Sequence, residues 1–121
     1  MELREREADV DDVVILDLAG RLDIFTMPPL QDWIANTLAR PRCKIVVNMD
    51  AVAFLDSTGL ATLVQGMKLC QKMGGDLYLC CLRQPVRMIF EMTRLDKAFA
   101  IFAAEADAVA ALAGLDSAPA G

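Results

Sequence analysis

Residues 49–60, MDAVAFLDSTGL, have the pattern of a strand that passes directly into a helix. Asp56, Ser57 and Thr58 are typical helix-capping residues, because each offers a side-chain oxygen to the unpaired N–H groups of a first helical turn. We therefore predict that a helix begins here. The positive end of its dipole would then lie at the Ser57 hydroxyl.

The residues that follow have the spacing of an amphipathic helix. Apolar side chains recur at steps of three and four and so share one face, while polar side chains occupy the other. Gly74 and Gly75 end the pattern, because glycine readily adopts the left-handed backbone of a helix C-cap. The predicted buried positions are Leu60, Leu63, Val64, Met67 and Cys70, and the predicted exposed positions are Gln65, Lys68, Gln71 and Lys72.

Strand-like and helix-like segments alternate through the rest of the chain. Apolar and β-branched runs predict strands, the charged N-terminal segment suits an edge strand, and capping hydroxyls and prolines mark helix ends. The predicted strands are 2–7, 13–19, 44–49, 76–82 and 98–102. The predicted turns and loops are 9–12, 21–25 and 50–55. Three other helices are predicted. The first begins at Thr26 and ends at Arg40-Pro41, with an apolar stripe of Leu30, Trp33, Ile34 and Leu38. The second spans 86–93, with Val86, Ile89, Phe90 and Thr93 facing inward, and the third spans 105–112.

This alternation predicts parallel strands joined by right-handed crossovers. We expect a single-domain α/β fold with about five strands in a mostly parallel sheet, an antiparallel edge strand and about four helices. The domain is expected to span residues 2–113, with 114–121 as a flexible C-terminal tail.

Composition narrows the classes of function. An apolar fraction of 55% in 121 residues is ample for one core. The chain has no histidine, so a Ser-His or Cys-His triad cannot form, and we expect no enzyme activity, catalytic residue, metal site or cofactor. The four cysteines show no CxxC spacing and are predicted to be reduced core thiols.

Charge and hydropathy bear on partners and location. The net charge of −5 argues against a nucleic-acid partner, which would call for a basic surface. No apolar run approaches the roughly 18–20 residues that span a bilayer, and the acidic start is unlike a signal peptide. We therefore expect a cytoplasmic protein that acts on neither nucleic acid nor membrane.

In its strand-to-helix context, the segment from Phe54 to Leu60 resembles the phosphorylation segment of STAS domains, most closely that of single-domain anti-sigma factor antagonists. Three other segments resemble the family in the same order. They are the Gly-Arg-Leu-Asp turn at 20–23, the central strand at 44–49 and the third helix at 87–93.

The resemblance implies a bacterial transcription regulator, an anti-anti-sigma factor. In that family the serine after the aspartate is phosphorylated, and the matching residue is Ser57, with Thr58 as the neighbouring hydroxyl. The unphosphorylated form is expected to bind an anti-sigma factor serine kinase and release its sigma factor. Phosphorylation would end this binding, and a PP2C-type phosphatase would reset the switch.

The resemblance also implies roles for neighbouring residues. Asp23 is expected to position the kinase or the serine hydroxyl, and Asp56 adds to an acidic patch. Arg21 departs from the family, which often has an acid there, and its guanidinium would pair with a phosphate and weaken the switch. Gly59 either permits close approach of a partner or relieves crowding in the first helical turn.

Phosphorylation of Ser57 would add about −1.5 to −2 charges. The helix start is expected to tolerate an anion, because its dipole and free N–H groups favour one. The effect would then fall on the partner, since a dianion at a docking surface repels acidic groups and is costly to desolvate.

Other interpretations stay open. In the simplest interpretation, Ser57 only caps the N-terminus of the helix. A STAS protein that serves a transporter ATPase or a stress-sensing assembly would carry the same motif. A nucleotide-binding STAS module is a further alternative, although the chain has neither GxxxxGK[ST] nor GxGxxG. Arg83, Arg87 and Arg94 form either a second contact surface or a solvated face, and the oligomeric state is undetermined.

Overall fold

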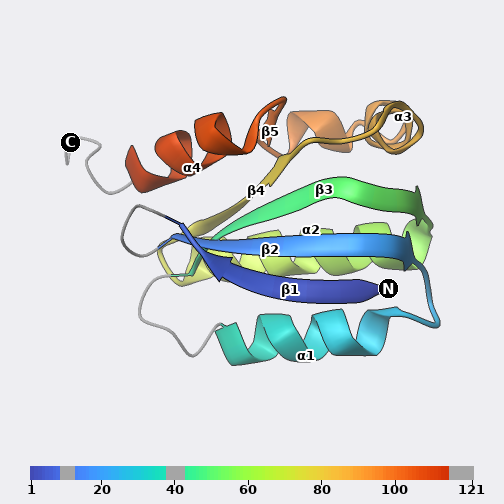
Figure 1. Cartoon of the computed structure of the whole chain (residues 1–121), viewed down its shortest axis with the longest axis horizontal. Helices are drawn as coiled ribbons and strands as arrows, with labels where there is room; N and C mark the ends of the chain where they lie inside the picture. The colour runs from blue at the N-terminus through green and yellow to red at the C-terminus, as the bar shows by residue number, and fades with distance from the viewer. Residues whose placement is uncertain (9–12, 38–42, 115–121) are drawn as a thin grey trace.

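The computed structural model describes residues 1–8, 13–37 and 43–114. In this part of the chain, five strands form one sheet in sequence order (Figure 1), and four α-helices and one 3-10 turn connect or cover them. The strands are β1 (Glu2–Glu7), β2 (Val13–Leu22), β3 (Lys44–Leu55), β4 (Asp76–Cys80) and β5 (Ile101–Phe102). The helical elements are α1 (Met27–Thr37), α2 (Ser57–Lys72), α3 (Gln84–Met92), η1 (Leu95–Lys97) and α4 (Glu105–Ala113).

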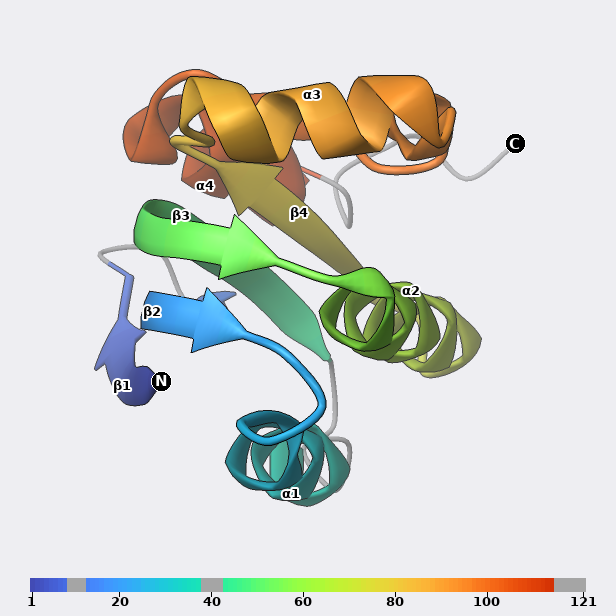
Figure 2. The same ribbon diagram turned by 90° about the vertical axis from the view of Figure 1, so that its right-hand side faces the viewer.

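The sheet is mixed, as predicted. β1 pairs antiparallel with β2, and β2 to β5 are parallel neighbours. Right-handed crossovers that step in one direction place their helices on one side of a sheet. Accordingly, α1, α2 and α3 bury side chains in one large core cluster. α4 follows β5 and closes the other face over a smaller cluster (Figure 2).

The centre of the sheet is fully covered. Ile45, Val46 and Val47 of β3 are all 0% exposed, which explains their continuous apolar run. On α2 the predicted stripe is buried except for the half-buried Val64, and the predicted polar positions are exposed. The helix ends as expected, with Gly74 at φ 86 and the Gly75 N–H donating to the Cys70 carbonyl. Cys43, Cys70 and Cys80 are buried and Cys81 is half-buried, and these four described cysteines form no disulfide.

The first two residues of the predicted loop 21–25, and the whole of the predicted loop 50–55, prove to be strand. β2 continues past Gly20 to Leu22, and β3 continues through 50–55, where a loop was expected. The two extensions pair with each other, Arg21 with Phe54 and Leu22 with Leu55, after a register shift between Gly20 and Arg21. Because this pairing joins residues distant in sequence, local composition did not indicate it. The loop after β2 therefore begins only at Asp23.

Smaller boundaries also differ from the predictions. β4 ends at Cys80, since Cys81 has a positive φ of 64°, and the last strand comprises only Ile101 and Phe102. α3 begins at Gln84 and ends at Met92, so that Thr93 is exposed rather than inward. Some predictions lie outside the described residues: the turn at 9–12, Leu38, the helix end at Arg40-Pro41, and the tail beyond Gly114.

Candidate functional site

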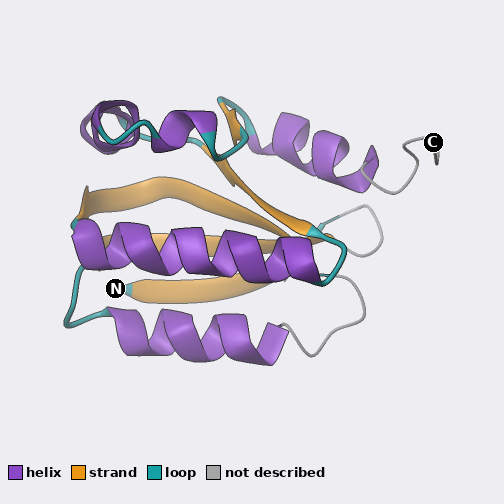
Figure 3. Ribbon diagram, turned by 180° about the vertical axis from the view of Figure 1, so that it is seen from behind, coloured by secondary structure: helices purple, strands orange, loops and turns teal. Residues whose placement is uncertain are grey.

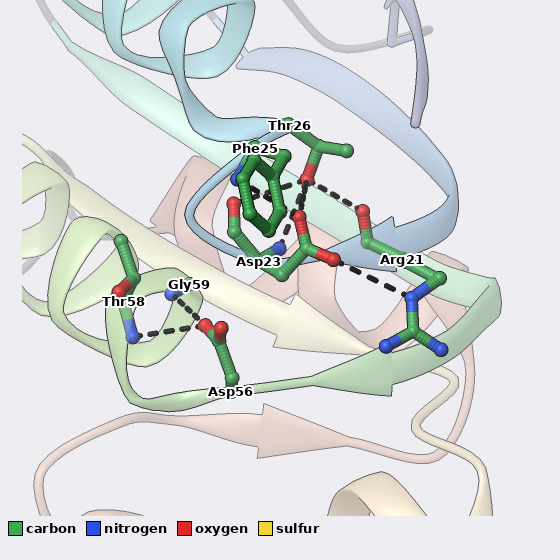
Figure 4. Close-up of polar contacts among 7 residues, drawn as sticks. All are labelled: Arg21, Asp23, Phe25, Thr26, Asp56, Thr58 and Gly59. Atoms are coloured by element: carbon green, nitrogen blue, oxygen red, sulfur yellow. Dashed lines mark hydrogen bonds and ion pairs between the residues drawn. The ribbon is translucent and has the colours of Figure 1, made fainter.

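The start of α2 separates the capping residue from the exposed hydroxyl. Asp56 is the N-cap, with extended backbone angles of −102° and −176°. Its Oδ1 accepts the N–H groups of Thr58 at 2.9 Å and Gly59 at 3.0 Å (Figure 4). Ser57 is the first helical residue, and its side chain is exposed. Its hydroxyl makes no hydrogen bond to another described residue.

The Asp56 carboxylate changes the expected electrostatics of the helix start. It already occupies the N–H groups of Thr58 and Gly59, which were expected to be free for an anion. A phosphate on Ser57 would therefore lie beside an existing carboxylate rather than in an empty anion site. The modification would add charge to a surface that is already acidic.

The loop after β2 lies directly against this helix start. The Asp56 N–H donates to the Leu22 carbonyl at 3.1 Å. Gly59 is buried against the same residue, and a Cβ at position 59 would lie 2.6 Å from the Leu22 carbonyl oxygen. Gly59 thus serves close packing within the molecule, the second of the two roles considered for it.

Asp23 organises the loop between β2 and α1. Its N–H donates to Thr26 Oγ1 at 2.9 Å, and its Oδ1 accepts the Phe25 N–H at 3.0 Å. The Thr26 hydroxyl, expected to cap α1, lies 2.7 Å from the Arg21 carbonyl and closes this loop instead. Desolvation raises the pKa of Asp23, but the hydrogen bonds from Phe25, Arg21 and Thr26 outweigh it, and the pKa is lowered. The carboxylate is therefore ionised at neutral pH.

Arg21 is engaged with neighbours of its own. Its Nε lies 3.4 Å from Asp23 Oδ2, and its guanidinium carbon lies 4.1 Å from the centroid of the Phe54 ring. The side chain is nevertheless 62% exposed. Pairing of Arg21 with a phosphate on Ser57 stays a prediction, and it would compete with these two contacts.

The same loop carries two exposed apolar side chains that the sequence predictions missed. Ile24 is 62% exposed and Phe25 is 88% exposed, although both are large hydrophobic residues. Phe54, at the end of β3, is 36% exposed. The available signal was an apolar pair inside a predicted loop, where solvated residues are expected. Exposed aromatic side chains of this kind are typical anchors of protein interfaces.

The predicted arginine face does not form one surface. Arg83 donates from Nε to the Asp50 carbonyl at 2.5 Å, so it is tied to β3. Arg87 is half-buried. Arg94 is exposed and lies beyond the end of α3, in a left-handed backbone conformation with a φ of 64°.

Within the described ranges, the side chains form no cluster of three potential metal ligands. No helix in this part of the chain is long and apolar enough to span a bilayer. The site comprises the exposed hydroxyl of Ser57, the hydrogen-bonded carboxylates of Asp23 and Asp56, and the exposed apolar side chains of Ile24 and Phe25. This combination suits modification by, and docking of, another protein.

Comparison with known proteins shows the family and the fold. The sequence pattern of the STAS domain matches residues 6–108. An anti-sigma F factor antagonist of Paenibacillus polymyxa is 30% identical over 101 residues, covering 83% of this chain and 86% of that protein. The crystal structure of an anti-sigma factor antagonist from Mycobacterium paratuberculosis superposes with a TM-score of 0.78 at 28% identity, covering 92% and 94% of the two chains. The Bacillus cell fate determinant SpoIIAA in its phosphorylated form shares the fold, with a TM-score of 0.69 at 20% identity over 91% and 98% of the chains.

Proposed function

The chain belongs to the STAS domain family, and from this membership we propose that it is an anti-sigma factor antagonist that works as a phosphorylation-controlled partner switch. The observation that carries the proposal is the Ser57 side chain, exposed at the first position of α2 beside the loop that presents Phe25. A protein of this kind acts in the bacterial cytoplasm, where sigma factors work.

In the unphosphorylated state the chain binds an anti-sigma factor serine kinase and thereby frees a sigma factor. Phe25 and Ile24 anchor the complex, because exposed apolar side chains gain most when a partner removes them from water. Asp23 holds the backbone of this loop in place through its hydrogen bonds.

The kinase then modifies Ser57. The Ser57 Oγ attacks the γ-phosphorus of ATP, the new O–P bond replaces the bond to ADP, and the hydroxyl proton passes to a base of the kinase. This chain supplies only the accepting oxygen and is not itself the enzyme. A PP2C-type phosphatase returns the serine by hydrolysis.

The phosphate ends binding through charge. It adds about −1.5 to −2 charges beside the Asp56 carboxylate. The dianion repels acidic groups of the partner, and a partner that places no positive group there has to desolvate it without a counter-charge. Both effects lower the affinity.

Phosphorylation with the anti-sigma factor kinases of the source genome tests the proposal. We expect ATP and Mg²⁺ to give one phosphate, located on Ser57 by peptide mass spectrometry, and Ser57→Ala to remain unlabelled. Thr58→Ala is the matched control and keeps its label, because it removes only the neighbouring hydroxyl. Labelling of Thr58, or of neither residue, contradicts the proposal.

A further inference from the structure

The outer face of α2 borders an open groove of about 920 Å³ that begins at Ser57. This α2 groove has an apolar floor formed by side chains of α2 together with Leu95 of η1. Figure 3 shows α2 in front of the sheet, beside α1, with no described element crossing over it. The lining residues are Ser57, Leu60, Ala61, Val64, Gln65, Lys68, Leu69, Gln71, Lys72 and Leu95.

The charge of the groove is opposite to that of the protein. Lys68 and Lys72 lie among its lining residues, and the described lining includes no aspartate or glutamate. The whole chain has 17 acidic residues against 12 basic ones. A basic rim around an apolar floor is therefore a local feature, and it complements a surface that is apolar and acidic.

The dimensions of the groove suit a helix. α2 has 16 residues, and the groove follows it from Ser57 to Lys72. At a rise of 1.5 Å per residue this length is about 24 Å, or about four helical turns. A helix with an apolar stripe can place that stripe on the floor and its flanking polar side chains on the rim.

We propose that the α2 groove binds an amphipathic helix with an acidic polar face, supplied by the anti-sigma partner. The proposal rests on the proposed function and names the chemistry that the partner presents. Lys68 and Lys72 pair with acidic side chains of the partner helix where that helix lies over the last turns of α2. A phosphate on Ser57 repels acidic groups over the first turns, because screening at physiological ionic strength confines its influence to about 8 Å.

Synthetic helices test the groove directly. Two stapled 16-residue peptides share one apolar stripe and differ only in a glutamate or a lysine polar face, and each is titrated into ¹⁵N-labelled protein. We expect the acidic peptide to bind at least tenfold more tightly and to shift the amides of Ala61, Val64 and Lys68. Equal affinity of the two peptides, or shifts confined to other elements, overturns the proposal.

Charge reversal supplies the matched control. Lys68→Glu with Lys72→Glu is expected to weaken the acidic peptide at least tenfold. Arg4→Glu makes half of this change in net charge at an exposed residue of β1 that does not line the groove, and it leaves the affinity within about twofold because distant exposed charges are screened. Ser57→Asp is expected to weaken binding of the acidic peptide and to strengthen binding of the basic one.

Failure of this proposal is distinguishable from failure of the proposed function. If the double lysine variant binds the kinase as wild type does while Ser57→Asp loses binding, the groove assignment is wrong and the partner switch stands. If no kinase labels Ser57 and the acidic peptide still binds the α2 groove, the groove assignment stands and the proposed function is wrong.

Discussion

At the start of α2, one residue caps the helix and the next presents an exposed hydroxyl, two roles that a single serine can combine. Asp56 accepts N–H groups of the first helical turn, and Ser57 presents, one residue later, an exposed hydroxyl that bonds to no other described residue. A phosphate can therefore be added without removing a hydrogen bond on which the helix depends. This arrangement would keep the stability of the domain independent of the state of the proposed switch.

Substitutions at these two positions are expected to affect stability differently. Asp56→Ala removes the cap and should lower the free energy of unfolding by about 1 kcal/mol. Ser57→Ala changes an exposed side chain and should stay within about 0.5 kcal/mol of wild type. Urea unfolding measures both, with Asp56→Asn as the control that keeps a capping oxygen. Equal losses for Asp56→Ala and Ser57→Ala would show that the serine also stabilises the helix.

Gly59 gives a second prediction at this scale. A methyl group there would lie 2.6 Å from the Leu22 carbonyl oxygen and 2.8 Å from a Leu55 methyl carbon. Gly59→Ala should therefore destabilise the domain by about 1–3 kcal/mol through overpacking. Gly114→Ala is the control, because a methyl group added at Gly114 would have no described atom within 4 Å beyond its chain neighbours. A neutral Gly59→Ala in urea unfolding would mean that the helix start can move away from the β2 loop.

Phe25 allows the docking surface to be tested apart from the phosphate. Because its side chain is 88% exposed, Phe25→Ala should leave the unfolding free energy unchanged. Loss of an interface anchor should weaken binding to the anti-sigma factor at least tenfold, or about 1.4 kcal/mol. Met92→Ala removes a similarly exposed side chain on α3 and serves as the control in calorimetry. Equal affinities of the two variants would place the interface elsewhere.

Among the elements, α4 is attached to the sheet by one charged cluster. Arg6 of β1 donates to Asp17 Oδ2 at 2.6 Å and to Glu105 Oε1 at 2.5 Å. Asn48 of β3 donates to the same Glu105 oxygen at 2.9 Å. The cluster thus joins β1, β2 and β3 to the first residue of α4, all through half-buried side chains.

This cluster makes the stability of the domain depend on pH. The hydrogen bonds from Arg6 lower the pKa of Asp17. Desolvation raises the pKa of Glu105, but the hydrogen bonds from Arg6 and Asn48 outweigh it, and the pKa is lowered. The folded state therefore binds fewer protons than the unfolded state, and the stabilisation is lost as the pH falls below the ordinary values of 3.8 and 4.5.

Replacing Arg6 should remove this dependence. Arg6→Met leaves two carboxylates without their cation, so urea midpoints measured from pH 7 to pH 3 should fall less steeply than in wild type. Arg4→Met is the control on the same strand, since Arg4 makes only the smallest contribution to the lowered pKa of Asp17. A wild-type acid slope in Arg6→Met would mean that other carboxylates control the acid sensitivity.

The elements also show how far the sequence predicts this fold and site. The strand cores, the start of α2 and the position of Ser57 followed from local patterns, since caps and apolar periodicity are encoded within a few residues. The continuation of β3 through Asp50 to Leu55 did not, because its pairing with β2 is a long-range contact. The outward position of Phe25 depends on the hydrogen-bonded loop around Asp23, which composition does not reveal.

At the scale of the whole molecule, the candidate site lies on one side of the sheet and the smaller core on the other. The face covered by α1, α2 and α3 holds the larger core and presents Ser57, the exposed loop and the α2 groove. The face covered by α4 holds the smaller core, to which Val46 and Leu112 contribute. β2, β3 and β4 contribute side chains to both clusters.

This separation predicts that the two cores can be weakened with different consequences for binding. Leu112 and Leu63 are both 0% exposed, the first on α4 and the second on α2. Truncating either to alanine should cost about 2–5 kcal/mol of stability. Below the temperature at which each variant begins to unfold, Leu112→Ala should bind the anti-sigma factor within about twofold of wild type, because distant sites act independently. Leu63→Ala should bind more weakly, since the cavity lets α2 and its first turn shift. Calorimetry on samples shown by circular dichroism to be fully folded distinguishes the two, and an equal loss for Leu112→Ala would mean that the sheet transmits changes between its faces.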